Sequence, residues 1–406
     1  MKLLVLPLIL VTTWAFSAPD EETLGRSQGY PVCPIADYGK QHCLVGQFSN
    51  FDKIVPARKV AKGASVLELK RAPQAEAALR YRLREGGEAN IDKFLDTNRN
   101  TGLLVLKGDT LLAERYQYDR TAEQRFQSMS MAKTVVAMLV GIAVSEKKIA
   151  SIDDLAVQYV ADLKGHPYGE TSLRHLLTMS SGVKFSEIYD GKDDVQALGR
   201  KTFSQQGPGG ADTVSTFRTR EAPAGTRFSY ASAETQVLGL VLRAAVGKPL
   251  AEYLSEKIWQ PMGAEADATW LMDAGGYELG YAGLNATLRD WGRFGLLLAN
   301  DGALNGRQII PADWVRAATT AEAPYLKVGA VSKFNGYGYQ TWLIHPEKRM
   351  FALLGVRGQA IFVDPESKVV IVHTGVHEDQ RGTTSRYDQF SLFFGTAARA
   401  AQFASH

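Results

Sequence analysis

Cysteine and histidine are scarce in this chain of 406 residues, which contains two cysteines and seven histidines. Cys33 and Cys43 cannot supply a four-ligand zinc site by themselves, and no His-x-His pair lies near them. The sequence also lacks a His-x-His-x-Asp run, which argues against a metal-dependent hydrolase. We therefore predict a protein that needs neither a metal ion nor another cofactor.

The sequence has no large excess of positive or negative charge. It also has no repeats and no low-complexity segments. The 46 basic and 43 acidic residues leave a net charge of +3, and no basic block is present. This balance gives no support for a nucleic acid or an anionic membrane as a partner. The apolar content of 45% is ordinary for a globular protein, and a chain of this length can bury a large core.

A long apolar run lies at the N-terminus, at residues 3–16 after Lys2. The small residues Ala15 and Ser17 fit cleavage of a secretory signal peptide after Ser17, although an uncleaved anchor is the alternative. The run is short for a membrane span, so we expect no stable membrane insertion after processing. The sequence thus predicts an exported protein, periplasmic or secreted, with residues 1–17 as its signal peptide.

The two cysteines agree with export, because Cys33 and Cys43 can close a small disulfide loop in an oxidising compartment. Such a bridge is expected to constrain an N-terminal arm, residues 18–90, without a part in the chemistry. Residues 91–406 then form the predicted catalytic domain.

Past the arm, strand and helix patterns alternate along the chain. A hairpin is predicted at residues 102–106 and 111–118. Helical patterns are found at residues 131–160, 173–179, 235–259, 288–298 and 387–402, and late strand-like runs at 337–344, 350–356, 360–363 and 369–374. This order predicts an α+β fold, with an antiparallel sheet flanked by helices and a mostly helical lobe inserted in it.

A serine and a lysine three residues apart, Ser130 and Lys133, begin an apolar helical stretch. Residues at this spacing share one face of a helix, so the hydroxyl can lie beside the amine. The positive potential of a helix N-terminus favours an oxyanion and disfavours a charged ammonium. A neutral lysine is the base that a serine nucleophile needs, so the pair suggests acyl transfer without a histidine.

The same S-x-x-K spacing occurs again at Ser145 and at Ser181, so the spacing alone is weak evidence. Ser145 belongs to a charged helix end, and Gly182 after Ser181 suggests a turn. The structural alternative to a catalytic pair is that Ser130 caps the helix and that the Lys133 side chain extends to solvent.

Tyr230 is a second candidate for the chemistry, since it follows a Pro-Gly turn and leads into a predicted helix. A tyrosine held near a serine and a lysine can relay a proton to or from a leaving group. A buried structural tyrosine is the alternative, and Tyr253, which repeats the Tyr-x-Ser pattern within a helix, is assigned to packing.

These segments resemble the serine β-lactamase and penicillin-binding-protein superfamily over roughly residues 90 to 400. The similarity is closer to its class C-like branch, with certain carboxylesterases and the 6-aminohexanoate-dimer hydrolases. Ser130-Met131-Ala132-Lys133 is similar to the nucleophile motif, residues 176–182 to the L-L-x-x-x-S-G segment, and Tyr230-Ala231-Ser232 to the Y-x-N motif. The resemblance implies a β-lactamase/transpeptidase-like fold, with Ser130, Lys133 and Tyr230 catalytic and Ser232 at the substrate.

The third family motif, K-T-G or H-x-G on a core strand, is where the chain departs from the pattern. His373-Thr374-Gly375 matches it literally but ends the last predicted strand, whereas residues 355–359 fit the family's position better. Gly358 and Gln359 resemble a G-Q pair of the 6-aminohexanoate-dimer hydrolases, and Arg357 is either a substrate-binding cation or an ordinary surface charge. The missing Lys-Thr pair argues against recognition of a β-lactam carboxylate.

Three further residues are candidates for the substrate cleft. Glu187 and Tyr189 lie where amide hydrolases of the branch have a similar acidic and aromatic stretch, although a solvated loop is the alternative. Asn285 lies in a segment that resembles another recurrent helix start of the family.

The predicted function is hydrolysis of a small-molecule ester or amide through an acyl-enzyme on Ser130. Lys133 takes the serine proton directly or through Tyr230, and the oxyanion lies between the N–H of Ser130 and one near Gln359. A class C-like β-lactamase or D,D-peptidase is one alternative, and a non-catalytic exported binding protein of the same fold is another. The sequence leaves the natural substrate and the oligomeric state open.

Overall fold

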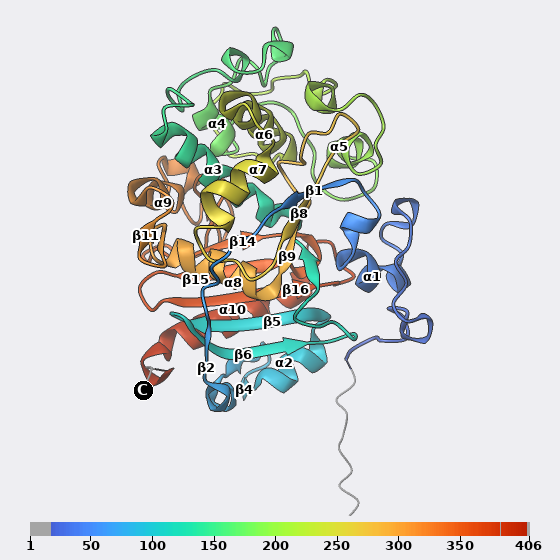
Figure 1. Cartoon of the computed structure of the whole chain (residues 1–406), viewed down its shortest axis with the longest axis vertical. Helices are drawn as coiled ribbons and strands as arrows, with labels where there is room; N and C mark the ends of the chain where they lie inside the picture. The colour runs from blue at the N-terminus through green and yellow to red at the C-terminus, as the bar shows by residue number, and fades with distance from the viewer. Residues whose placement is uncertain (1–17, 382, 404–406) are drawn as a thin grey trace, which may run out of the picture.

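An eight-stranded sheet forms the centre of the computed structural model, which describes residues 18–381 and 383–403 (Figure 1). The predicted signal peptide lies outside the described residues. In spatial order the strands are β12 (Gly336–Tyr337), β13 (Trp342–Leu343), β14 (Phe351–Leu354), β15 (Ala360–Asp364), β16 (Val369–Gly375), β5 (Asn100–Lys107), β6 (Thr110–Tyr116) and β2 (Lys70–Arg71). Neighbours pair antiparallel except β2 with β6, and the predicted β5–β6 hairpin is confirmed.

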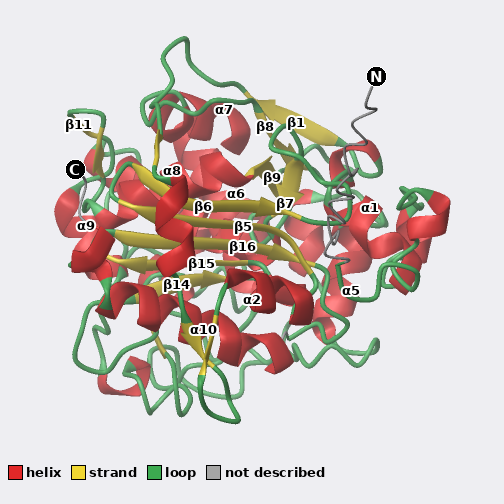
Figure 2. Ribbon diagram, turned by 90° about the horizontal axis from the view of Figure 1, so that it is seen from below, coloured by secondary structure: helices red, strands yellow, loops and turns green. Residues whose placement is uncertain are grey.

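Both faces of this sheet are buried, which explains why its central strands are apolar throughout. Along β16, Val370 and Val372 face one hydrophobic core, while Val369 and Ile371 face the other. Helix α8 (Leu288–Ala299) packs on the first face, and α10 (Thr383–Ala398) packs on the second beside α2 (Ile91–Thr97) (Figure 2).

A mostly helical lobe stands above the sheet in Figure 1, as the sequence predicts. Its helices are α3 (Ala132–Ser145), α4 (Leu173–Leu177), α5 (Asp194–Thr202), α6 (Ser232–Val246), α7 (Leu250–Leu254) and α9 (Ala312–Ala318). A smaller sheet has the strand order β1 (Ala57–Val60), β8 (Ala268–Leu271), β9 (Leu284–Thr287) and β7 (Arg125–Gln127). After β7 the chain enters the lobe at α3. The α+β fold class is therefore confirmed. Among the described helices, none has the length and apolar character needed to cross a bilayer.

Three of the predicted elements that are shorter or more divided than expected end or break near a residue with a left-handed backbone conformation. The helix predicted at 131–160 ends at Ser145, shortly before Lys147 with a φ of 58°. The helix predicted at 235–259 divides at Gly247, whose φ is 68°, and Pro249 prevents its continuation. The strand predicted at 337–344 is interrupted near Gln340, whose φ is 51°.

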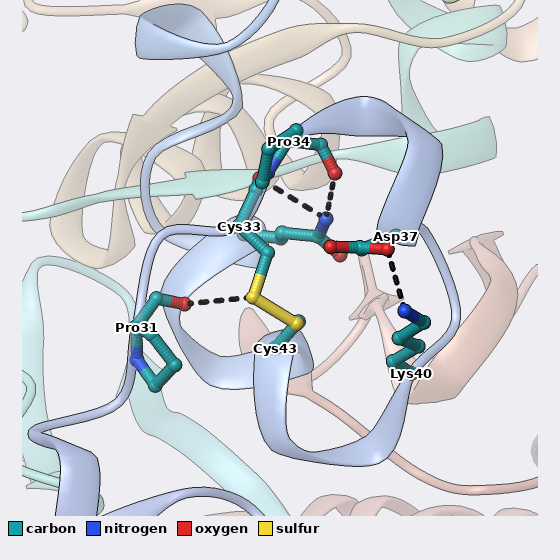
Figure 3. The surroundings of a disulfide bond; sticks show 7 residues. Pro31, Cys33, Pro34, Asp37, Lys40 and Cys43 are labelled. Atoms are coloured by element: carbon teal, nitrogen blue, oxygen red, sulfur yellow. Dashed lines mark hydrogen bonds and ion pairs between the residues drawn. A yellow bond between two sulfur atoms is a disulfide. The ribbon is translucent and has the colours of Figure 1, made fainter.

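Residues 18–90 lie against the rest of the molecule and supply β1 and β2 to the two sheets. A disulfide joins Cys33 to Cys43 ahead of the short helix α1 (Leu44–Phe48) (Figure 3). The Gln47 side chain donates hydrogen bonds to the carbonyl oxygens of Cys33 and Pro34, which anchors the disulfide loop to this helix. The predicted bridge is thus present.

Candidate functional site

Ser130 lies in a 3-10 turn, Met129–Met131, between the end of β7 and the start of α3. The backbone of Met129 is left-handed, with a φ of 44°, a conformation that costs an L-residue roughly 1–2 kcal/mol. Ser128 holds the turn to β9, since its N–H donates to the carbonyl oxygen of Leu284 at 2.8 Å. The turn leaves Ser130 half-buried, while both of its neighbours are fully buried.

Lys133 lies one helical turn after Ser130, as the spacing predicts. Its Nζ donates hydrogen bonds to Ser130 Oγ at 2.8 Å and to the carbonyl oxygen of Tyr281 at 3.2 Å. Only 1% of the side chain's surface is exposed, and this burial lowers the pKa of Lys133 from 10.5 to about 8. Burial therefore disfavours the ammonium by about 3 kcal/mol, and a substantial fraction of Lys133 is neutral near pH 8.

Tyr230 lies beside the same lysine, just before α6. Lys133 Nζ is 5.0 Å from the centroid of its ring, and the ring stacks on Trp342 with centroids 5.3 Å apart. Burial and the negative charge of Glu187 raise the pKa of Tyr230 well above its usual value, although a hydrogen bond with Ser130 acts in the opposite direction. The phenol is therefore protonated at neutral pH, as a proton donor must be.

Two cavities meet at Ser130, with volumes of about 1300 Å³ and about 270 Å³. Glu187 and Tyr189 line both cavities, and Ser232 lines the smaller one. Glu187 accepts hydrogen bonds from the Tyr189 hydroxyl at 2.6 Å, from the Ser232 hydroxyl at 3.0 Å and from the Ser232 N–H at 2.9 Å. These three candidates therefore form one hydrogen-bonded network at the cavities that Ser130 lines, rather than a solvated loop.

The structure does not bring the other four candidates to the lining of either cavity. Asn285 is buried in β9, where its amide donates to the carbonyl oxygens of Gly283 and Thr269. The guanidinium of Arg357, which is 3% exposed, donates to the carbonyl oxygens of His377 and Glu378, so it is not a surface charge, and it lines neither cavity.

Gly358 and Gln359 likewise serve the connection between β14 and β15. A Cβ on Gly358, whose φ is 92°, would lie 2.1 Å from the His377 ring. The Gln359 amide donates to the carbonyl oxygen of Gly375 at 2.6 Å and thus ties this connection to β16. Both residues shape the backbone of this connection. The sequence predicts that they bind substrate, but neither lines a cavity.

The strand end at Gly355 and Val356 is the part of this connection that reaches the turn of Ser130. A Cβ on Gly355 would lie 2.7 Å from the carbonyl oxygen of Ser128, so only glycine permits this approach. Val356 lines both cavities together with Ser130. The sequence places the second oxyanion donor near Gln359, whereas the residue of this connection that lines both cavities with Ser130 is Val356.

The disulfide loop forms part of the smaller cavity, a role that the sequence does not reveal. Ile35, Ala36 and Tyr38, all between the two cysteines, belong to its lining. Tyr38 packs its ring on Phe48 and Phe51, with centroids 6.4 Å and 6.1 Å apart. The bridge thus supports a wall of the site, contrary to the expectation that it constrains only the arm.

The competing motifs have structural roles. Ser145 Oγ donates to the carbonyl oxygen of Ile142, and Ser181 Oγ donates to buried Glu234 at 2.6 Å. His373 is fully buried, between the rings of Phe94 and Phe362. The hydroxyl of Tyr253 donates to Glu146 at 3.0 Å at the edge of the core, so its assignment to packing is confirmed.

Two further patterns that suggest chemistry carry none. Residues 25–29 read G-x-S-x-G, the spacing of a nucleophile elbow, but Ser27 is exposed on a 3-10 turn, and residues 18–24, which the structure describes, contain no strand. Cys33, His42 and Cys43 have ligand atoms within 4.8 Å of one another, yet the disulfide occupies both sulfurs.

Comparison with known proteins agrees with this geometry. The β-lactamase family model matches residues 88–386. The 6-aminohexanoate-dimer hydrolase of Paenarthrobacter ureafaciens is 28% identical over 293 residues, covering 70% of this chain and 74% of that protein. A Bacillus anthracis structure, provisionally assigned as a 6-aminohexanoate-dimer hydrolase, has a TM-score of 0.82 at 26% identity over 90% of this chain and 96% of its own.

The fold is shared more widely. EstCE1, described as a hydrolase with promiscuous acyltransferase activity, has a TM-score of 0.60 at 16% identity, covering 75% of this chain and 96% of its own. A penicillin-binding protein from Bacillus halodurans has a TM-score of 0.57 at 17% identity, covering 72% and 96%. With most of its length matched by the family model, this chain belongs to the β-lactamase family of hydrolases, within the superfamily of serine β-lactamases and penicillin-binding proteins.

Proposed function

We propose that this protein is an exported serine hydrolase that cleaves an ester or amide bond through an acyl-enzyme on Ser130. One observation carries the proposal: a buried lysine of lowered pKa lies 2.8 Å from the hydroxyl of a serine at the junction of two cavities. A binding protein needs no such pair, since a neutral base beside a hydroxyl serves to remove its proton.

The reaction proceeds in two steps. Ser130 Oγ attacks the carbonyl carbon while its proton passes to neutral Lys133, and the N–H groups of Ser130 and Val356 bind the oxyanion. Tyr230 then donates its phenolic proton to the leaving atom and regains a proton from Lys133. In the second step water attacks the acyl carbon and Lys133 accepts its proton. The bond to Ser130 Oγ then breaks, and Lys133 returns that proton to the departing oxygen, which restores the hydroxyl and the neutral amine.

Short esters and small linear amides are expected to be better substrates than β-lactams, because the Lys-Thr pair of the third family motif is missing here. The measurement is kcat/KM for p-nitrophenyl acetate, a linear 6-aminohexanoate dimer and nitrocefin on one preparation. A nitrocefin value about tenfold above the others, or about 1.4 kcal/mol in transition-state binding, would favour the β-lactamase alternative.

Export of the protein predicts a mature chain that begins near Ala18 and carries the Cys33–Cys43 bridge. The bridge in the structure supports this proposal, because disulfides persist in oxidising compartments. Intact mass of protein recovered from the periplasm or medium, before and after thiol alkylation, measures both features. Retention of residues 1–17, or alkylation of both cysteines without a reductant, would contradict it.

The activity is expected to rise as the pH increases through about 8, since only neutral Lys133 acts as a base. The negative charge of Glu187 raises the pKa of Lys133, so Glu187→Gln removes that effect and lowers it further. The rising limb of kcat/KM against pH should therefore move to lower pH in this variant. Glu221→Gln, an exposed substitution outside both cavities, should leave the limb in place. A limb unmoved by Glu187→Gln would contradict the assignment of Lys133.

A further inference from the structure

Glu234 is a deeply buried acidic residue that has no part in the reaction proposed above. It lies in the first turn of α6, four residues after Tyr230, and is 1% exposed. Its Oε1 accepts hydrogen bonds from the Ser181 hydroxyl at 2.6 Å and from the Ser181 N–H at 3.3 Å. Among the described residues, its Oε2 has no hydrogen-bond partner. A charged carboxylate is costly in such a place, so the position favours a neutral carboxyl group.

Ser181 belongs to a turn, residues 179–182, that holds the segment before α6. Three carbonyl oxygens of this turn each accept a hydrogen bond of 2.8 Å from residues 221–229. The donors are the N–H groups of Glu221, Gly225 and Ser229. The chain that leads to Tyr230 therefore runs along the turn and is bound to it up to the residue before the tyrosine.

The first turn of α6, which follows Tyr230, is held by two carboxyl groups. Glu187 accepts from the N–H and the hydroxyl of Ser232 at the cavities. Glu234 lines neither cavity and binds the same helical turn to Ser181 from within the core. Tyr230 thus lies between a segment bound to the turn of Ser181 and a helix bound to the same turn through Glu234.

The titratable groups that interact with Glu234 are Arg220, Tyr168 and Tyr337, among the residues that the structure describes. The guanidinium of Arg220 donates to two backbone carbonyl oxygens and to Thr171 Oγ1, so neutral oxygens occupy it. Burial raises the pKa of Tyr168 and of Tyr337 well above the usual value, so both phenols stay neutral.

Burial also raises the pKa of the Glu234 carboxyl to about 8, although the hydrogen bonds from Ser181 and the charge of Arg220 act in the opposite direction. The carboxyl is therefore protonated at neutral pH and ionises as the pH rises through about 8. The charge that acts on Lys133 is that of Glu187, so ionisation of Glu234 leaves the base unchanged.

We propose that Glu234 is a positioning residue, which binds the first turn of α6 to Ser181 and so holds the Tyr230 hydroxyl where it can protonate the leaving group. The inference rests on the proposed role of Tyr230 and names the group that places it. Ionised Glu234 puts a poorly solvated charge between the helix and the turn, which disfavours their contact. Proton donation by Tyr230 should therefore weaken as the pH rises through about 8.

Two acetate esters separate this effect from the action of Lys133. p-Nitrophenolate leaves without a proton, whereas the ethoxide of ethyl acetate needs one from Tyr230. Both esters form the same acetyl-enzyme and use the same base. We define the leaving-group ratio as kcat/KM for ethyl acetate divided by kcat/KM for p-nitrophenyl acetate. Because both esters are measured on one preparation, the ratio does not change when part of the protein is unfolded.

Glu234→Gln keeps an oxygen for Ser181 but cannot ionise. In the parent protein, the leaving-group ratio should fall by about tenfold between about pH 7 and about pH 10, a part of what a positioned acid contributes. In Glu234→Gln the ratio should stay constant over this range. Glu252→Gln, an exposed substitution on α7 outside both cavities, is the matched control and should follow the parent. A ratio that falls equally in Glu234→Gln would overturn the proposal.

Glu234→Ala removes the contact at every pH, so its leaving-group ratio at neutral pH should be about tenfold below that of the parent. Tyr230→Phe removes the donor itself and should lower the ratio at least as much. If Tyr230→Phe leaves the ratio unchanged, the proposed role of Tyr230 fails and this inference fails with it. If Tyr230→Phe lowers the ratio and Glu234→Ala does not, this inference alone is refuted. If Glu234→Ala does not fold, the pH dependence in Glu234→Gln decides.

Discussion

Replacement of Ser130 by alanine is expected to reduce ester hydrolysis to the rate without enzyme. The variant keeps the turn and the helix, because the serine hydroxyl supports neither of them in the structure. It removes the atom that forms the acyl-enzyme, and loss of a serine nucleophile costs on the order of 10⁴–10⁶ in kcat. Hydrolysis of p-nitrophenyl acetate, with circular dichroism to verify folding, measures the effect.

Two controls accompany this variant. Ser145→Ala changes the second S-x-x-K copy and should retain full activity, since that hydroxyl donates to the carbonyl oxygen of Ile142 and Ser145 lines neither cavity. A fluorophosphonate should form its adduct on Ser130, as located by mass spectrometry of peptides. Turnover by Ser130→Ala above the uncatalysed rate, or an adduct on another serine, would disprove the assignment.

Replacement of Lys133 by methionine should lower kcat by about 10²–10⁴, the usual contribution of a general base. Methionine has a similar length and suits the fully buried position, so the fold should persist. It cannot accept the proton of Ser130, and any activity that remains should no longer rise through about pH 8. The full pH profile of kcat, with thermal unfolding as a check on stability, gives the comparison.

Lys148→Met provides the matched control, because Lys148 is the exposed lysine of the second S-x-x-K copy. This variant should preserve both the rate and the pH profile. If Lys133→Met kept the rising limb, another group would have to be the base. Tyr230, whose pKa burial and Glu187 raise, would then be excluded as well, because its phenol stays protonated in that range.

Local interactions explain which parts of the fold could be predicted. The β5–β6 hairpin follows from apolar runs around a Gly-Asp turn, and α8 follows from an apolar face after Thr287, whose side chain caps its first turn. The expectations failed at Lys147 and Gln340, where a non-glycine residue takes a left-handed conformation. That conformation costs energy which only contacts from distant residues can offset, so no pattern in the sequence reveals it.

The sequence alone indicated the proposed nucleophile and base, because a spacing of three residues in a helix brings Ser130 and Lys133 together whatever surrounds them. Its resemblance to known motifs added Tyr230. Only the tertiary structure gave Lys133 its lowered pKa, turned Arg357 toward backbone carbonyls and joined Glu187 to Ser232, 45 residues along the chain. It also made Tyr38 of the disulfide loop a wall of the site. Burial and long-range contacts are properties of the packed chain, whereas a helical spacing is already present in its sequence.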